Sequence, residues 1–333
     1  MPDRFFRHGA ICSRSAPKHK TVITQAFVLA AGLGTRLRPL TDELPKPLVP
    51  IFQKPLITFA LDHLIATGIQ RFVINTHRLP HLFEHQFAEK HYRGRSVDLV
   101  NEPELLETGG GIKNAEPLLH DGDFLTYSGD ILTDIPLDSL IEEHFRAAND
   151  VTLALRETGF TPSIAYQQGR IVDIGERFGI AGDYDFANIA VWNKKIFARI
   201  PQRKISFIPV LLDWIAEGGK IGGLVLNEGK WFNIGSSVQY LEVHRIIASQ
   251  NWSPDFIGDA DWAARTAKSA TIDTSAQLRG LTVVGADCYI GAGAILEDTI
   301  VWPGAQSASL SELQDCIVRT RQRAEGILQN AIV

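Results

Sequence analysis

A glycine-rich stretch, LAAGLGTRLRPLT at 29–41, carries the residues best suited to chemistry. The apolar run that opens it predicts a buried strand ending at Gly32 and Gly34, residue types that let a chain bend sharply and let a ligand approach the backbone. A helix opening directly after these glycines would point several backbone amides into one concavity, and such a concavity binds phosphate oxygens. Arg36 and Lys46 add two positive charges beside it. The stretch therefore predicts a site for a polyphosphate.

The two glycines do not complete the other well-known glycine patterns. A dinucleotide-binding fingerprint requires G-x-G-x-x-G/A, and Leu37 occupies its last position. A P-loop requires G-x-x-x-x-G-K-S/T, which this stretch does not contain. An ordinary strand-to-loop turn remains the alternative for the G-x-G pair alone, whereas the longer string is far more specific.

The elements that must position this stretch alternate between strands and helices. Short apolar runs lie at 27–29, 72–75, 97–100, 124–128 and 151–156, and helical patterns at 55–66, 80–90, from the glycine turn at 109–111 to about Leu119, and at 137–148. This alternation predicts a layered α/β sheet with helices on both faces. Ligands in such sheets bind at the carboxyl ends of strands, so we expect the site in the loops after Leu29, Val100 and Ser128. Strands at 163–192 without intervening helices suggest an antiparallel extension.

The loops after Val100 and Ser128 carry further candidate binding residues. In LETGGGI at 106–112, three glycines at a strand-to-helix turn would let a flat ligand such as a nucleobase approach the backbone. Glu104 and Glu107 would then accept hydrogen bonds from the base. In YSGD at 127–130, Asp130 is a hard oxygen ligand placed where a diphosphate would arrive, which suits Mg²⁺. A tight turn is the plainer interpretation of either motif alone.

These motifs together resemble the sugar-1-phosphate nucleotidylyltransferases. The string G-x-G-T-R-L-R-P-L-T, the PKP at 45–47, the LETGGG loop and the G-D pair carry the resemblance. It implies a Rossmann-like doubly wound mixed sheet (the nucleotidyltransferase type A fold) and the formation of an NDP-sugar and pyrophosphate from an NTP and a sugar 1-phosphate, with Mg²⁺. The Glu before Thr108 and the glycine triplet look most like the N-acetylmuramate-1-phosphate uridylyltransferase branch, which uses UTP. The alternative is a mannose- or heptose-1-phosphate guanylyltransferase, which uses GTP.

The resemblance also implies roles for individual residues. Asp130 and Asn233 would bind the metal, although Asn233 stands where much of the family has Asp, which leaves open a non-catalytic sensor of nucleotide-sugar. Glu176 and Asn188 would bind the sugar. The expected catalytic residues are Arg36, Lys46 and Asp130. The expected nucleotide-binding residues are Ala31, Gly32, Gly34, Thr35, Arg36, Glu104, Thr108, Gly109 and Gly110.

A six-residue period runs through the end of the chain. Its apolar positions are Ile272, Leu278, Val284, Ile290, Leu296 and Trp302. A triangular coil with one inward-pointing residue on each side produces this period, and the pattern resembles the hexapeptide left-handed parallel β-helix. We therefore expect a disordered or processed tail at 1–20, a nucleotidyltransferase domain at 21–250, a linker at 251–268 and a β-helix at 269–333. Open coil ends favour a homo-oligomer formed through the β-helix.

Composition bounds the remaining possibilities. The chain has 333 residues, enough for two domains, and its net charge of -5 gives no general attraction to nucleic acid. Cys12, Cys288 and Cys316 form no C-x-x-C pair and suggest free thiols in a reducing compartment. No apolar run approaches the roughly 20 residues that span a bilayer, so we expect a cytoplasmic protein without membrane partners. His77, His81 and His85 are four apart but lack an acidic partner, so they indicate a solvated helix face rather than a metal site.

Overall fold

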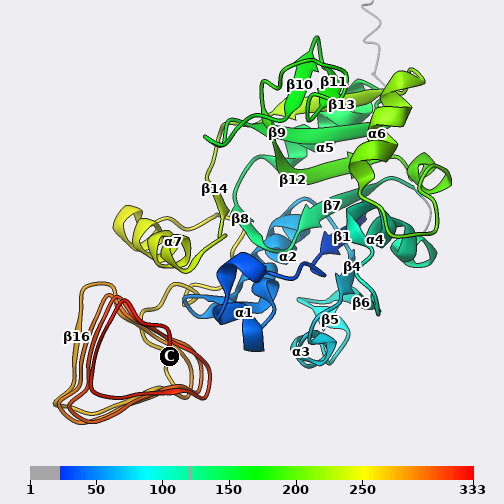
Figure 1. Ribbon diagram of the computed structural model, residues 1–333. Helices are drawn as coiled ribbons and strands as arrows, with labels where there is room; N and C mark the ends of the chain where they lie inside the picture. Colours follow the sequence, from blue (N-terminus) through cyan, green and yellow to red (C-terminus); the bar gives the residue numbers. More distant parts are fainter. Residues whose placement is uncertain (1–22, 120–121) are drawn as a thin grey trace, which may run out of the picture.

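The computed structural model describes residues 23–119 and 122–333, so the predicted tail at 1–20 and Cys12 lie outside the described part. Its main feature is a mixed sheet of ten strands (Figure 1). These strands are β1 Gln25–Leu29, β4 Arg71–Thr76, β5 His91–Tyr92, β6 Arg95–Asn101, β7 Phe124–Ser128, β9 Val151–Arg156, β10 Ile164–Gln167, β11 Arg170–Ile174, β12 Asp185–Trp192 and β13 Ile221–Val225. Their spatial order is β10-β11-β13-β9-β12-β7-β1-β4-β6-β5. The predicted doubly wound mixed sheet is confirmed.

Helices cover both faces of the sheet. Helices α2 (Leu56–Ala66), α3 (Pro80–Gln86) and α5 (Leu137–Arg146) pack into one hydrophobic core, and α4 (Glu107–Ala115) and α6 (Phe207–Ala216) pack into another on the opposite face. In α5 the buried residues Leu137, Leu140, Ile141 and His144 recur at the spacing of one helix face. None of the helices in the described residues is long and apolar enough to cross a membrane.

Strand β12 differs from the prediction of an antiparallel extension. Strands β10 and β11 do form an antiparallel pair at the sheet edge, but β12 lies inside the sheet, antiparallel to both β7 and β9. Its residues from Ile189 to Trp192 are fully buried, which explains why it takes a central position. The pairing of β12 with β9 shifts register between Phe186 and Ala190, and Asn188 within that bulge has φ +63°. Asparagine tolerates this left-handed conformation better than most residues.

The end of the chain forms a parallel β-helix, whose triangular cross-section is plain in Figure 1. Its strands stack in three parallel sheets, β15-β18-β21-β24, β16-β19-β22-β25 and β17-β20-β23. They are β15 Thr271–Ile272, β16 Gln277–Arg279, β17 Val283–Val284, β18 Tyr289–Ile290, β19 Ile295–Glu297, β20 Ile300–Val301, β21 Gln306–Ser307, β22 Glu312–Gln314, β23 Ile317–Val318, β24 Arg323–Ala324 and β25 Ile327–Gln329. Cys288 and Cys316 are free thiols in its interior.

The prediction that Trp302 points into the coil is wrong. Val301 pairs with Val284 and fills the inward position, so the repeat shortens by one residue at this corner. Trp302 instead packs into a core that the β-helix shares with the preceding domain. Its Nε1 donates to Oη of Tyr240 at 2.9 Å, and that hydroxyl donates to the carbonyl of Pro50 at 2.6 Å. The β-helix is therefore joined directly to helix α7 (Ser237–Gln250) and to the hairpin of β2 (Pro50–Ile51) and β3 (Lys54–Pro55).

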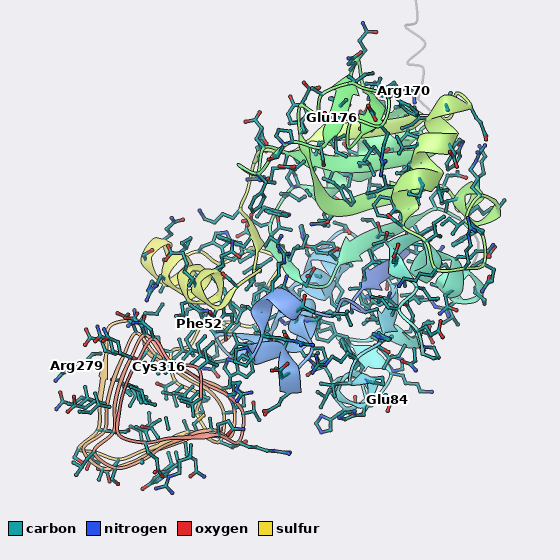
Figure 2. All side chains as sticks on the ribbon, viewed as in Figure 1. Phe52, Glu84, Arg170, Glu176, Arg279 and Cys316 are labelled. Carbon is teal, nitrogen blue, oxygen red and sulfur yellow. The ribbon has the colours of Figure 1, made fainter. Side chains whose placement is uncertain are left out.

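The segment 251–268, expected as a linker, packs against the large domain. The carbonyl of Trp262 accepts a hydrogen bond from Gln53, and its ring contacts Phe52 and Phe59. Figure 2 labels Phe52 close to the β-helix, where this segment contacts the large domain. The amide of Phe52 also donates to Nε2 of His244 in helix α7 at 3.0 Å.

Candidate active site

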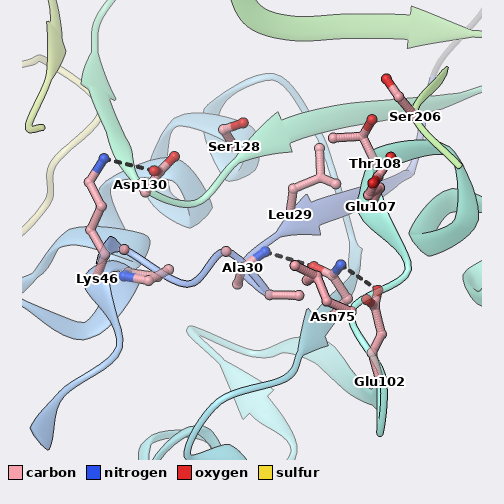
Figure 3. Close-up of a pocket in the computed structure, with 15 residues that line it drawn as sticks. Leu29, Ala30, Lys46, Asn75, Glu102, Glu107, Thr108, Ser128, Asp130 and Ser206 are labelled. Carbon is pink, nitrogen blue, oxygen red and sulfur yellow. Dashed lines mark hydrogen bonds and ion pairs between the residues drawn. The ribbon is translucent and has the colours of Figure 1, made fainter. Parts of the chain in front are cut away.

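Two adjoining cavities lie at the carboxyl ends of β1, β4, β6 and β7, where the sequence places the site. The first has a volume of about 420 Å³ and is lined by Leu29, Ala30, Ala31, Gly32, Gly34, Lys46, Pro47, Asn75, Glu102, Leu105, Glu107, Thr108, Ser128, Asp130 and Ser206 (Figure 3). The second has about 300 Å³ and is lined by Leu33, Gly34, Thr35, Arg36, Leu37, Lys46, Leu105, Asp130, Ile234 and Gly235. Lys46 and Asp130 line both, so they stand at the junction of the two cavities.

Lys46, Asp130 and Asn233 converge at that junction from three separate elements. The ammonium group of Lys46 lies 2.7 Å from Oδ2 of Asp130 and 3.4 Å from Oδ1 of Asn233. Asp130 sits between β7 and β8 (Ile131–Thr133), and β8 pairs with β14 (Trp231–Asn233), which brings Asn233 alongside. The structure thus unites the three residues that the sequence assigned to charge and metal binding.

The helix expected directly after Gly34, in the glycine loop that follows β1, is only one turn long. A single 3-10 turn, Thr35–Leu37, follows the glycines in place of a longer helix, because Pro39 and the short helix α1 (Leu40–Glu43) come directly after it. Gly34 has φ +61°, and a Cβ there would lie 3.0 Å from Thr41, so this position requires glycine. Arg36 is exposed and lines the second cavity, and within the described residues it forms no ion pair with an acidic side chain.

The glycine triplet packs against another segment of the chain, and neither Gly109 nor Gly110, which the sequence assigned to nucleotide binding, lines the two cavities. Both glycines lie inside helix α4, and a Cβ on either would come within 2.9 Å of backbone atoms in 203–207. The amide of Gly110 donates to the carbonyl of Ile205 at 2.9 Å. This crossing segment carries Ser206 into the wall of the first cavity, beside Thr108, whose hydroxyl accepts from the amide of Phe207 at 3.2 Å (Figure 3). The glycines therefore admit a protein segment whose position could not be read from the triplet itself.

Glu102, not Glu104, faces the cavity. Glu104 is exposed and lines neither cavity, whereas Glu102 is 1% exposed and lines the first. Asn75 Nδ2 donates to Oε1 of Glu102 at 2.7 Å, and Asn75 Oδ1 accepts from the amide of Ala30 at 2.7 Å. Sequence reasoning missed both residues, although each lies at the carboxyl end of a parallel strand, the position that should have drawn attention to them.

The two predicted sugar contacts fall outside both cavities. Glu176 is exposed in the turn after β11, at the outer part of the sheet (Figure 2). Strands β13, β9 and β12 separate β11 from β7, a distance of about 19 Å at the usual strand spacing. Asn188 lies closer, because Ile189 pairs with Tyr127 and the next residues along are Asn188 and Ser128. Asn188 thus borders the first cavity without lining it.

The oxygens of Asp130 and Asn233 fit a magnesium ion. They already converge on one cation, the ammonium group of Lys46, and carboxylate and amide oxygens are the donors that Mg²⁺ prefers. In the residues that the structure describes, no group of three or more His, Cys, Asp or Glu is placed to hold a metal. Mg²⁺ is commonly held by one or two protein oxygens together with substrate phosphates, and Asp130 and Asn233 supply two such oxygens.

Comparisons with known proteins agree with this geometry. The model of the nucleotidyl transferase family matches residues 25–250. A mannose-1-phosphate guanylyltransferase from Mycobacterium tuberculosis is 32% identical over 298 residues, covering 84% of this chain and 80% of the relative. An N-acetylmuramate alpha-1-phosphate uridylyltransferase from Caulobacter vibrioides is 33% identical over 230 residues, covering 63% of this chain and 91% of the relative.

Among solved structures, the inositol-1-phosphate CTP transferase from T. maritima superposes with a TM-score of 0.54 at 21% identity. It covers 66% of this chain and 91% of its own, and this likeness supports the fold. The matches to the family model and to the mycobacterial relative settle the family, since each spans more than two thirds of this chain. The chain therefore belongs to the nucleotidyl transferase family, as a sugar-1-phosphate nucleotidylyltransferase.

Proposed function

We propose that the chain joins an NTP to a sugar 1-phosphate, releases pyrophosphate and uses Mg²⁺. The observation that carries this proposal is the convergence of Lys46, Asp130 and Asn233 where the two cavities meet. One cavity is bordered by the glycine loop and by Thr108 and Ser206, and we assign it to the nucleotide. The site then has a charged centre between the nucleotide pocket and the second cavity, which Arg36 lines.

The chemistry needs positioning and charge neutralisation more than proton transfer. The phosphate of the second substrate is already an anion, so one of its oxygens attacks the α-phosphorus without a general base. A new P–O bond forms there as the bond to the β-phosphate breaks and pyrophosphate leaves. Lys46 would hold the reacting phosphates together, and Arg36, on the wall of the second cavity, would stabilise the leaving pyrophosphate. Mg²⁺ held by Asp130 and Asn233 would supply further neutralisation of the phosphate charge.

Two nucleotides are candidates, and different observations favour each. The LETGGG loop, together with the match to the Caulobacter vibrioides uridylyltransferase over 91% of that protein, favours UTP with an amino-sugar 1-phosphate such as N-acetylmuramate 1-phosphate. The match to the mycobacterial guanylyltransferase is 298 residues long and therefore extends into the β-helix, which favours GTP with mannose 1-phosphate or a heptose 1-phosphate. Asn188, beside Ser128, is the nearer of the two predicted sugar contacts, whereas the cavities lend no support to Glu176.

Pyrophosphate release tests the proposal. The full chain is incubated with Mg²⁺, each of the four NTPs and a panel of sugar 1-phosphates that includes N-acetylmuramate 1-phosphate, mannose 1-phosphate and heptose 1-phosphates. Release that requires one NTP, one sugar 1-phosphate and Mg²⁺ supports the enzyme and identifies its substrates. Binding of a nucleotide-sugar without release under any condition would point instead to a sensor.

We also propose that the chain self-associates through its β-helix. Four of the exposed large hydrophobic side chains in the described residues lie on this domain, namely Leu278, Tyr289, Leu310 and Ile327. Ile327 and Leu310 are 79% and 77% exposed. Light scattering after size-exclusion chromatography tests this, and a monomer at micromolar concentration would contradict it.

A further inference from the structure

A continuous relay of hydrogen bonds runs along the first cavity, and Figure 3 draws its bonds from Ala30 to Asn75 and from Asn75 to Glu102. It begins at the amide of Ala30, passes through the side chains of Asn75 and Glu102, and ends at the amide of Leu106. The three donor–acceptor distances are 2.7, 2.7 and 2.9 Å. Ala30 opens the glycine loop, and Leu106 precedes helix α4, whose Glu107 and Thr108 line the cavity.

The relay is buried and closely packed. Asn75 is 3% exposed and Glu102 is 1% exposed, so neither side chain can replace a lost partner with bulk water. A Cβ on Gly111 would lie 2.9 Å from Oε1 of Glu102 and 3.1 Å from Nδ2 of Asn75. The backbone of Glu102 is also fixed, since its amide donates to Thr76 at 2.7 Å.

We propose that Asn75 and Glu102 are positioning residues that hold the two halves of the nucleotide cavity in register. This inference rests on the proposed function, because it takes the first cavity to be the nucleotide site. The glycine loop and the segment at Leu106 belong to different parts of the sequence, and the relay is a direct polar connection between them. A change at Glu102, on the Leu106 side, should therefore alter phosphate binding at the other end.

The polarity of the relay allows a decisive exchange of residues. Asn75 accepts from Ala30 and donates to Glu102, and Glu102 accepts from both Asn75 and Leu106. In Asn75→Asp alone, two carboxylates would face each other. In Glu102→Gln alone, either the NH₂ groups of two side-chain amides would face each other, or the hydrogen bond from the amide of Leu106 would be lost. In the double variant, Asp at 75 accepts from Ala30 and from the new amide group, while Gln at 102 accepts from Leu106. The exchange keeps every loop contact and the net charge.

The experiment compares the full-length wild type, both single variants, the exchange variant and a control. The control is Asn149→Asp, a buried asparagine that bonds Thr152 and Arg170 and lines neither cavity of the site. Calorimetric titration gives the Kd for inorganic pyrophosphate, which probes the phosphate end alone. Steady-state kinetics with UTP and GTP gives KM and kcat, and thermal unfolding gives the midpoint of each variant.

Each single variant should weaken pyrophosphate binding and raise the KM for the NTP by about tenfold or more, with a smaller fall in kcat. The exchange variant should return both values to within about threefold of the wild type. An exchange variant as impaired as the singles would overturn the relay, because it would show that the carboxylate of Glu102 itself acts on the ligand. Unchanged binding in both singles would overturn it as well.

The same variants separate this inference from the proposed function. If the folded wild type binds neither UTP nor GTP, the proposed function fails. The midpoints of thermal unfolding then test whether the relay holds the two segments together. Midpoints lowered in both singles and restored by the exchange support it, and an exchange that does not restore them contradicts it. A single variant that fails to fold leaves the comparison of the exchange variant with the wild type, which decides in the same way.

Discussion

The ammonium group of Lys46 lies 2.7 Å from Oδ2 of Asp130, although the two residues are 84 positions apart in the chain. The Lys46 side chain is 7% exposed and that of Asp130 is 37% exposed, so the pair joins a buried cation to a carboxylate that reaches the cavities. We expect Lys46→Met and Asp130→Asn each to lower kcat by about 10²-fold or more, as removal of a group that stabilises a transition state does. Rates of pyrophosphate release check this. Lys268→Met, which breaks an exposed Lys–Asp pair, should leave them unchanged.

Arg36 should matter where its neighbour Arg38 does not. Arg36 lines the second cavity, whereas Arg38 lines neither cavity and pairs with Asp42 at 3.3 Å on the surface. Arg36→Ala should lower kcat by about 10²-fold because the leaving pyrophosphate loses a positive charge. Arg38→Ala should stay close to the wild type. Equal losses in the two variants, measured by pyrophosphate release, would show that Arg36 has no specific role.

Gly109 and Gly32 should respond differently to alanine. A Cβ on Gly109 would lie 2.9 Å from three backbone atoms of 205–207, whereas nothing lies within 4 Å of a Cβ on Gly32. Gly109→Ala should therefore lower the free energy of unfolding by about 1–3 kcal/mol, the usual effect of overpacking. Gly32→Ala should unfold like the wild type in urea but bind nucleotide less well, since its methyl group enters the first cavity. A fully stable Gly109→Ala variant would contradict the account of the triplet.

Stability should fall as the pH drops from about 7 towards 4. Burial lowers the pKa of His63 and of His244 to about 4 from the ordinary value of 6.5. Nε2 of His244 accepts from Phe52 and its Nδ1 donates to the carbonyl of Tyr240, so the folded state holds the neutral ring. Between these pKa values the unfolded chain binds more protons than the folded chain, so each histidine removes up to about 1.4 kcal/mol per pH unit. Urea unfolding at pH 7, 6 and 5 measures this slope, which His244→Gln should reduce.

Local sequence patterns predict most of the fold and the position of the site. Alternating apolar runs predict the strands that end at Leu29 and Ser128, and the rule that ligands meet the carboxyl ends of strands places Lys46 and Asp130 together. The six-residue period predicts the β-helix, because the repeat depends on local geometry. These features follow from residue type and spacing along short stretches of chain.

Contacts between distant segments account for what sequence reasoning missed. The glycine triplet admits the segment 203–207, which lies about a hundred residues away and carries no motif. The sequence offers both Glu102 and Glu104 near the end of β6, and only the packed sheet shows that Glu102 is the one that bonds Asn75. Trp302 leaves the coil because Tyr240 offers it a partner on a different domain. Each of these outcomes depends on a tertiary partner, which periodicity does not reveal.

A crystal structure of the chain with its preferred NTP and Mn²⁺ in place of Mg²⁺ tests the central claim most directly. We expect the anomalous signal of Mn²⁺ between Asp130 and Asn233, with Lys46 and Arg36 on the phosphates and the base beside Thr108 and Ser206. A nucleotide bound elsewhere, or a metal that contacts neither Asp130 nor Asn233, would contradict the account.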